Sequence, residues 1–135
     1  MDPNSAAAHS GLGLIYARKG MHAEAIAEMR KALDLSPGDT NAIGMLGYAY
    51  GAGGYRTEAR KVIDQLRELA TRRYVSSHHV ALIYAGLGAK DEALRWLEKS
   101  YEERSQWLTH MKGDPRLEGF HSDSRFKDLL RRIGF

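Results

Sequence analysis

The chain has 135 residues, which is enough for one domain with a substantial core. Its 20 Lys and Arg residues against 17 Asp and Glu give a net charge of +3 at pH 7, and so balanced a surface argues against a dedicated nucleic-acid interface. Because the chain contains no cysteine, disulfides and thiolate metal sites are excluded, and no apolar run approaches the roughly 20 residues needed to span a membrane.

One short pattern occurs three times at a spacing of 34 residues. A Leu-Gly pair (Val-Ala in the third copy) is followed by a tyrosine, a glycine and an alanine, and the tyrosines are Tyr16, Tyr50 and Tyr84. This period predicts stacked helix–turn–helix units, because one such unit cannot bury its apolar face alone. The small residues let paired helices approach, and the glycine ends the first helix in a left-handed conformation.

The first copy carries the pattern most fully, in Leu12-Gly13, Tyr16, Gly20, Ala25 and Pro37. The three copies resemble the tetratricopeptide repeat, over residues 3 to about 105. The resemblance implies an all-α, right-handed solenoid with three repeats and a C-terminal helical cap, at residues 6–39, 40–73, 74–107 and 108–135. Pro3 lies 34 residues before Pro37, so we interpret residues 1–5 as the truncated end of a preceding repeat and expect a longer parent protein.

Local signals predict the helix boundaries within these repeats. Ser5, Asp39 and Ser76 are expected to cap the first helix of each repeat, and Ser76 lies late enough to shorten the third by one turn. The second repeat lacks the terminal proline, so its second helix, roughly residues 56–70, is expected to run on toward Arg72-Arg73.

The period ends at Asp114-Pro115, which stands where a fourth Leu-Gly pair would be. The tail shows an amphipathic stretch around Trp107-Leu108, a helix start at Asp114-Pro115 and a second start at Ser122-Asp123. An apolar stripe at helical spacing follows, formed by Phe126, Leu129, Leu130 and Ile133. We predict a helix that covers the apolar end of the third repeat, in preference to a partner-binding or membrane-surface helix.

The tail also resembles a second group of proteins. Its segments 101–104, 107–108, 114–116 and 126–130 are similar to the C-terminus of bacterial multi-repeat proteins, in which the repeats follow a kinase, cyclase or winged-helix transcription-regulator domain. This resemblance implies a regulatory role for the repeats within a larger signalling protein.

The repeat resemblance implies a partner-binding groove, because the first helix of each repeat lines the concave face in the family. The apolar anchors and polar handles of this groove are Leu14, Arg18, Asn41, Tyr48, His78 and Leu82. Small residues such as Gly44 and Gly86 either shape a groove for a helix or extended peptide or only permit tight helix packing. Ser10 and Leu14 replace the Lys and Asn of the carboxylate clamp in chaperone-binding repeats, which argues against that ligand class.

Candidate catalytic and metal-ligating residues form no recognisable site in the sequence. The six histidines lack ligand-like spacing, and Ser76-Ser77 beside His78-His79 lacks an acid to orient a base. The glycine run at 51–54 lacks the lysine of a phosphate loop. We therefore expect no catalytic residue, no metal and no cofactor.

The first function hypothesis is a non-enzymatic protein–protein interaction module that binds a peptide or helix in its concave groove. The alternative is a regulatory C-terminal segment of a larger bacterial signalling protein, which docks on its own upstream domain or self-associates. A solenoid RNA binder is disfavoured because Arg18 alone is basic among the groove positions. We expect a protein or peptide partner, no nucleic acid, no membrane and a cytoplasmic location, and we consider a homodimer through the truncated N-terminal face.

Overall fold

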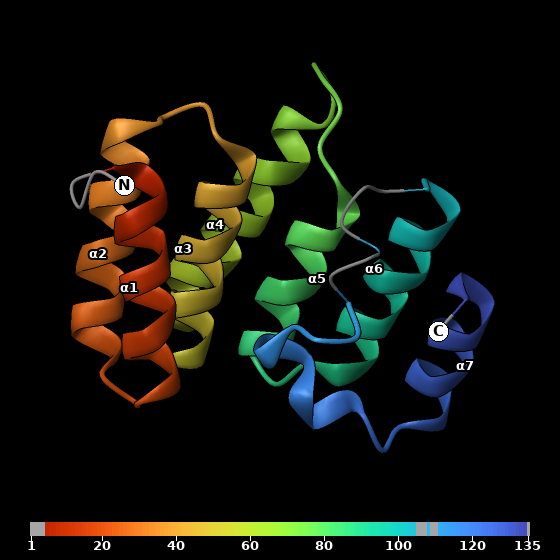
Figure 1. The fold of residues 1–135 in the computed structure, drawn as a ribbon. Helices are drawn as coiled ribbons and strands as arrows, with labels where there is room; N and C mark the ends of the chain where they lie inside the picture. Colours follow the sequence, from red (N-terminus) through yellow and green to blue (C-terminus); the bar gives the residue numbers. More distant parts are fainter. Residues whose placement is uncertain (1–4, 105–107, 109–110, 135) are drawn as a thin grey trace.

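The computed structural model describes residues 5–104, 108 and 111–134, and within these ranges every regular element is helical (Figure 1). The elements in chain order are α1 (Ala6–Arg18), α2 (His22–Leu35), α3 (Thr40–Ala52), α4 (Arg56–Leu69), α5 (Ser77–Gly86), α6 (Lys90–Glu102), the 3-10 helix η2 (Pro115–Phe120) and α7 (Ser124–Ile133). The all-α fold class expected from the 34-residue period is confirmed. The expectations for residues 1–4 and for Trp107 lie outside the described residues.

Side-chain caps begin the first helix of each repeat, as predicted. The side chains of Ser5, Asp39 and Ser76 accept hydrogen bonds from first-turn amides at 3.1, 2.9 and 3.2 Å. The α5 helix has 10 residues against 13 in α1 and α3, which is the shortening that the late cap predicts. The turn after each of these helices contains a glycine with positive φ, a conformation that glycine adopts without steric cost: Gly20 (77°), Gly54 (85°) and Gly88 (77°).

The predicted extension of α4 toward Arg72-Arg73 is wrong. The helix ends at Leu69, and the Thr71 hydroxyl donates a hydrogen bond to the Glu68 carbonyl at 2.7 Å. Such a local bond competes with continuation of the helix. The Arg73 guanidinium donates to the Gly38 carbonyl at 2.7 Å, which ties the segment after α4 to the turn before α3.

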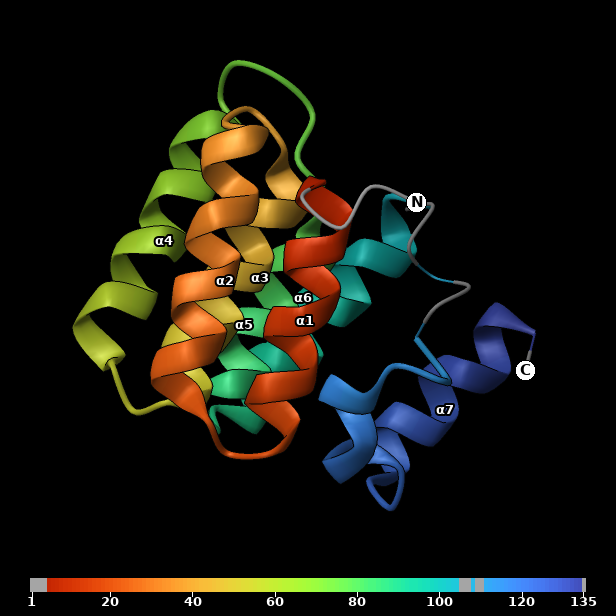
Figure 2. The ribbon, with the colours of Figure 1, turned by 60° about the vertical axis from the view of Figure 1, so that its left-hand side comes forward.

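The first helices of the repeats, α1, α3 and α5, pack side by side in chain order, and each second helix packs on the first helix of its own repeat (Figure 2). Glycines permit the close approach of α3 and α5. A Cβ atom on Gly44 would lie 3.0 Å from Cβ of His79, and one on Gly86 would lie 2.8 Å from the carbonyl oxygen of Tyr48. These two small residues of the predicted groove therefore serve helix packing.

The C-terminal tail covers the end of the third repeat, as predicted. Phe126 and Leu129 of α7 are buried in one apolar cluster with Leu97 of α6. At the rim of this contact, the Arg132 guanidinium pairs with the Glu98 carboxylate at 2.6 Å. In the part of the chain that the structure describes, no helix is long and apolar enough to cross a bilayer.

Candidate functional site

The six predicted groove residues lie on the three first helices. Leu14 and Arg18 belong to α1, Asn41 and Tyr48 to α3, and His78 and Leu82 to α5. Leu14, Tyr48 and Leu82 occupy the same repeat position, 34 residues apart, on helices that pack side by side. The fold therefore sets these three residues in one row. We use the name concave row for them together with Arg18, Asn41 and His78 of the same helices.

The chain's own tail covers the third-repeat end of this row. His78 and Leu82 are each only 1% exposed. Leu82 belongs to one apolar cluster with Met111 and Leu117, and η2, which carries Leu117, contacts α5. A partner can reach His78 and Leu82 only if the tail moves away. Binding of a partner by the six residues stays a prediction.

Tyr48 lies at the edge of the covered part, where a buried ion pair meets it. The Arg116 guanidinium pairs with the Asp114 carboxylate at 2.8 Å and lies 5.8 Å from the centroid of the Tyr48 ring. Burial raises the pKa of the Tyr48 phenol, against the opposing charges of Arg116 and Arg18. Burial also acts to raise the pKa of Asp114, but the hydrogen bonds and charge of Arg116 hold it below its ordinary value. Asp114 therefore stays ionised and paired.

His79 stands next to this cluster and is nearly inaccessible. Burial, assisted by the positive charge of Arg116, lowers the pKa of its imidazole to about 4, while the Asp39 carboxylate acts in the opposite direction. The imidazole is therefore neutral at physiological pH. A neutral side chain in tight contact with Gly44 of α3 acts as a packing residue at the α3–α5 contact.

The uncovered part of the concave row belongs to the first two repeats. Leu14 is half-buried and packs against the N-terminal core cluster, and Asn41 and Tyr48 are half-buried as well. Arg18 is exposed at the end of α1, and its charge acts on Tyr48. The part of the concave row next to the tail is therefore an apolar surface, formed by Leu14 and Tyr48, with the cation of Arg18 beside it.

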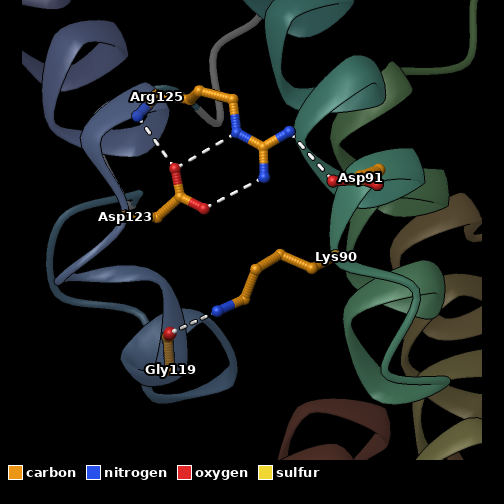
Figure 3. Close-up of polar contacts among 5 residues, drawn as sticks. All are labelled: Lys90, Asp91, Gly119, Asp123 and Arg125. Atoms are coloured by element: carbon orange, nitrogen blue, oxygen red, sulfur yellow. Dashed lines mark hydrogen bonds and ion pairs between the residues drawn. The ribbon is translucent and has the colours of Figure 1, made fainter.

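A cleft of about 720 Å³ separates α6 from α7, and ion pairs join most of the charged groups that line it, including Arg132 with Glu98 and Asp128. The Arg125 guanidinium bridges Asp91 at 2.9 Å and Asp123 at 3.1 Å, and Lys90 donates to the Gly119 carbonyl at 3.2 Å (Figure 3). These contacts attach the tail to α6. In the described ranges, no three His, Asp or Glu side chains are placed to hold a metal ion.

A family model described as Tetratricopeptide repeat matches residues 4–112. The chain belongs to the tetratricopeptide repeat family. A region of human Superkiller complex protein 3 is 32% identical over 101 residues, and one of Tetratricopeptide repeat protein 37 from Xenopus laevis is 30% identical over 118 residues. The matches cover 75% and 87% of this chain but 6% and 8% of those relatives. No solved structure gives a significant match.

Membership of the family supports the coarse functional class. Tetratricopeptide repeats are generally non-catalytic modules of protein–protein interaction, whose stacked helices present an extended surface. The relatives named above are vertebrate proteins, and the similarity of the tail to bacterial signalling proteins stays a hypothesis.

Sequence reasoning missed the contribution of the tail to the concave face. The spacing predicts Asp114 as a helix cap, which it is, because its carboxylate accepts from the Arg116 amide at 2.9 Å. The structure also places the Arg116 side chain over Tyr48. No local pattern signals this contact, because it joins a tail residue to a helix two repeats earlier.

Proposed function

We propose that the chain is a non-enzymatic interaction module that binds a peptide or helix along the concave row. One observation carries the proposal: the third-repeat end of the row already holds a peptide segment, the chain's own tail, against Leu82 and Tyr48. The same row continues into the first two repeats with Leu14, Asn41 and Arg18 uncovered by the tail. A partner segment binds to this uncovered part, runs along it toward η2, and packs its apolar side chains against Leu14 and Tyr48.

The proposal is tested with a charge placed in the uncovered part of the row. Leu14→Asp introduces a carboxylate among half-buried apolar groups, and Leu35→Asp, at an exposed position of α2, is the matched control. Partners recovered by pull-down with the wild-type chain should be retained by Leu35→Asp and lost by Leu14→Asp. Retention of every partner by a folded Leu14→Asp chain contradicts binding in this groove.

A second candidate function, self-association or docking on an upstream domain of the same protein, is supported by the outer face of α1. Ile15 is 52% exposed, whereas Ala49 and Ile83, at the same position of the next two repeats, are fully buried. Leu12, beside it, is also exposed, while its counterparts Leu46 and Val80 are buried. The fold therefore covers this face in two repeats and leaves it open in the first.

Light scattering separates self-association from the other roles of this face. A homodimer through α1 should become a monomer in Ile15→Asp and stay a dimer in Leu35→Asp. A wild-type chain that is monomeric at high concentration contradicts the homodimer. Docking on an upstream domain then requires that the chain bind that domain in a purified mixture, and that Ile15→Asp abolish the binding.

A further inference from the structure

The two junctions between repeats differ at three matched positions. At the first junction, between repeats one and two, the side chains of Leu33, Ile43 and Leu69 belong to or pack against the N-terminal core cluster. At the second junction, between repeats two and three, the residues 34 positions later are polar or charged: Arg67, Ser77 and Glu103. Three apolar groups that fill the first junction are therefore replaced at the second, each on a different helix or at its end.

A hollow of about 210 Å³ lies at the second junction, between α4, α5 and α6. Its inner wall is apolar and includes Leu66, Val75 and Val80, which are buried, and Trp96 forms a side wall. Ser77 lines the hollow where the matched Ile43 is a core residue. The space that a bulky side chain occupies at the first junction is therefore open at the second.

The charged groups that line the hollow are two cations, Arg67 and Lys99, and one anion, Glu103. The Glu103 carboxylate accepts hydrogen bonds from the amide and hydroxyl of Ser77 at 3.2 and 2.7 Å. The Lys99 ammonium lies 4.6 Å and the Arg67 guanidinium 5.8 Å from the centroid of the Trp96 ring. Neither cation forms an ion pair with a described residue.

We propose that this hollow, on the side of the molecule formed by the second helices, binds one large apolar side chain from an acidic segment of a partner protein. Its volume lies below the roughly 300–1,000 Å³ of small-molecule sites, and it suits a single anchoring side chain. Arg67, Trp96 and Lys99 also line a wider hollow of about 490 Å³ along α6, which gives the flanking peptide a path.

The lining of the hollow has one more cation than anions, and this excess favours an acidic partner segment. A carboxylate next to the apolar anchor meets Lys99 and Arg67, while the apolar side chain enters the hollow beside Trp96. Glu92 and Glu98 in the wider hollow pair with arginines, which leaves Glu102 as its remaining acid. We therefore place the anionic contact at Lys99 and Arg67, beside Trp96. This surface is separate from the concave row and does not depend on it.

The test uses a phage-displayed library of random dodecapeptides, selected on the purified chain, and measures the affinity of the enriched peptides by Trp96 fluorescence in a Trp107→Phe background. Enriched peptides should combine a Leu, Phe or Met with a neighbouring Asp or Glu. Their affinity should fall by roughly tenfold or more in Lys99→Glu, which inverts the charge beside the anchor. Lys61→Glu, on the exposed face of α4, changes the net charge equally and should leave the affinity unchanged.

A second variant tests the hollow itself. Ser77→Ile restores the residue type of the matched position Ile43, and it should abolish binding by filling the space. Its fold is checked by circular dichroism, and Lys99→Glu decides the question if the variant does not fold. The proposal is overturned if no peptide is enriched, if the enriched peptides lack an acid, or if their affinity is unchanged in Lys99→Glu. If only Leu14→Asp abolishes the binding of the enriched peptides, they bind in the concave row, and this result contradicts the second site.

Discussion

The buried imidazole of His79 makes the stability of the fold depend on pH. His79 is 3% exposed, and burial together with the Arg116 charge lowers its pKa from 6.5 to about 4, against the pull of Asp39. The unfolded chain takes up this proton near pH 6.5, and the folded chain takes it up only near pH 4. The contribution of a neutral His79 is therefore full above about pH 6.5 and is lost as the pH falls toward 4.

The size of the loss follows from the difference between the two pKa values. At about 1.4 kcal/mol per pKa unit, the loss reaches roughly 3 kcal/mol below pH 4. Between about pH 7.5 and about pH 5, the same linkage gives a loss of about 2 kcal/mol. A small domain has a total unfolding free energy of about 5–15 kcal/mol, so this single group is a measurable part of it.

Urea unfolding at the two pH values measures the effect. His79→Gln keeps a polar side chain of similar length that does not titrate, so its acid-induced loss should be about 2 kcal/mol smaller than that of the wild type. His121→Gln, at an exposed position, is the matched control and should lose as much as the wild type. Equal losses in wild type and His79→Gln would refute the assignment of a buried, neutral imidazole.

Three further predictions concern packing. Gly47→Ala places a Cβ atom 2.6 Å from Cδ1 of Ile83 and should lower the unfolding free energy by about 1–3 kcal/mol, measured by urea unfolding. The methyl group of Gly11→Ala lies in open space on α1 and should raise the unfolding free energy by roughly 0.5–1 kcal/mol. A lower unfolding free energy would contradict the exposed placement of this glycine. Phe126→Ala empties a fully buried position and should lower the unfolding free energy by about 3–5 kcal/mol. Arg132→Ala removes surface ion pairing and should lower it by less than about 1 kcal/mol. If thermal melts gave the reverse order, ion pairing rather than apolar packing would hold α7 in place.

The elements that the sequence predicts well are those with a local cause. Ser76 caps α5 because its hydroxyl bonds to an amide two residues away, and Gly54 turns the chain because it tolerates a positive φ. Both signals act within a few residues and hold wherever the fold places them. The predicted extension of α4 is wrong because Thr71 forms a side-chain hydrogen bond to Glu68 that no periodic pattern reveals.

The sequence predicts which groove residues occupy equivalent positions, but it does not predict which of them are accessible. The 34-residue period sets Leu14, Tyr48 and Leu82 at equivalent positions, and the structure places them on helices that pack side by side. Whether a row is accessible depends on what lies over it, and here the tail covers one end with Leu117 and Arg116. That outcome depends on contacts between distant parts of the chain, for which a repeat pattern that has already ended carries no information.

The second junction shows why a repeat pattern is informative where it fails. A single serine at Ser77 could be compensated by a small shift of its neighbours, because interiors partly close around a lost side chain. Arg67 and Glu103 prevent this closure, since a charged head group stays at the rim and does not enter apolar space. Polar or charged residues replace apolar ones at three matched positions around one hollow. This argues for a binding surface, because packing alone favours the apolar residues of the first junction. A packing fault would predict that Ser77→Ile leaves peptide binding unchanged, and a binding site predicts that it abolishes it.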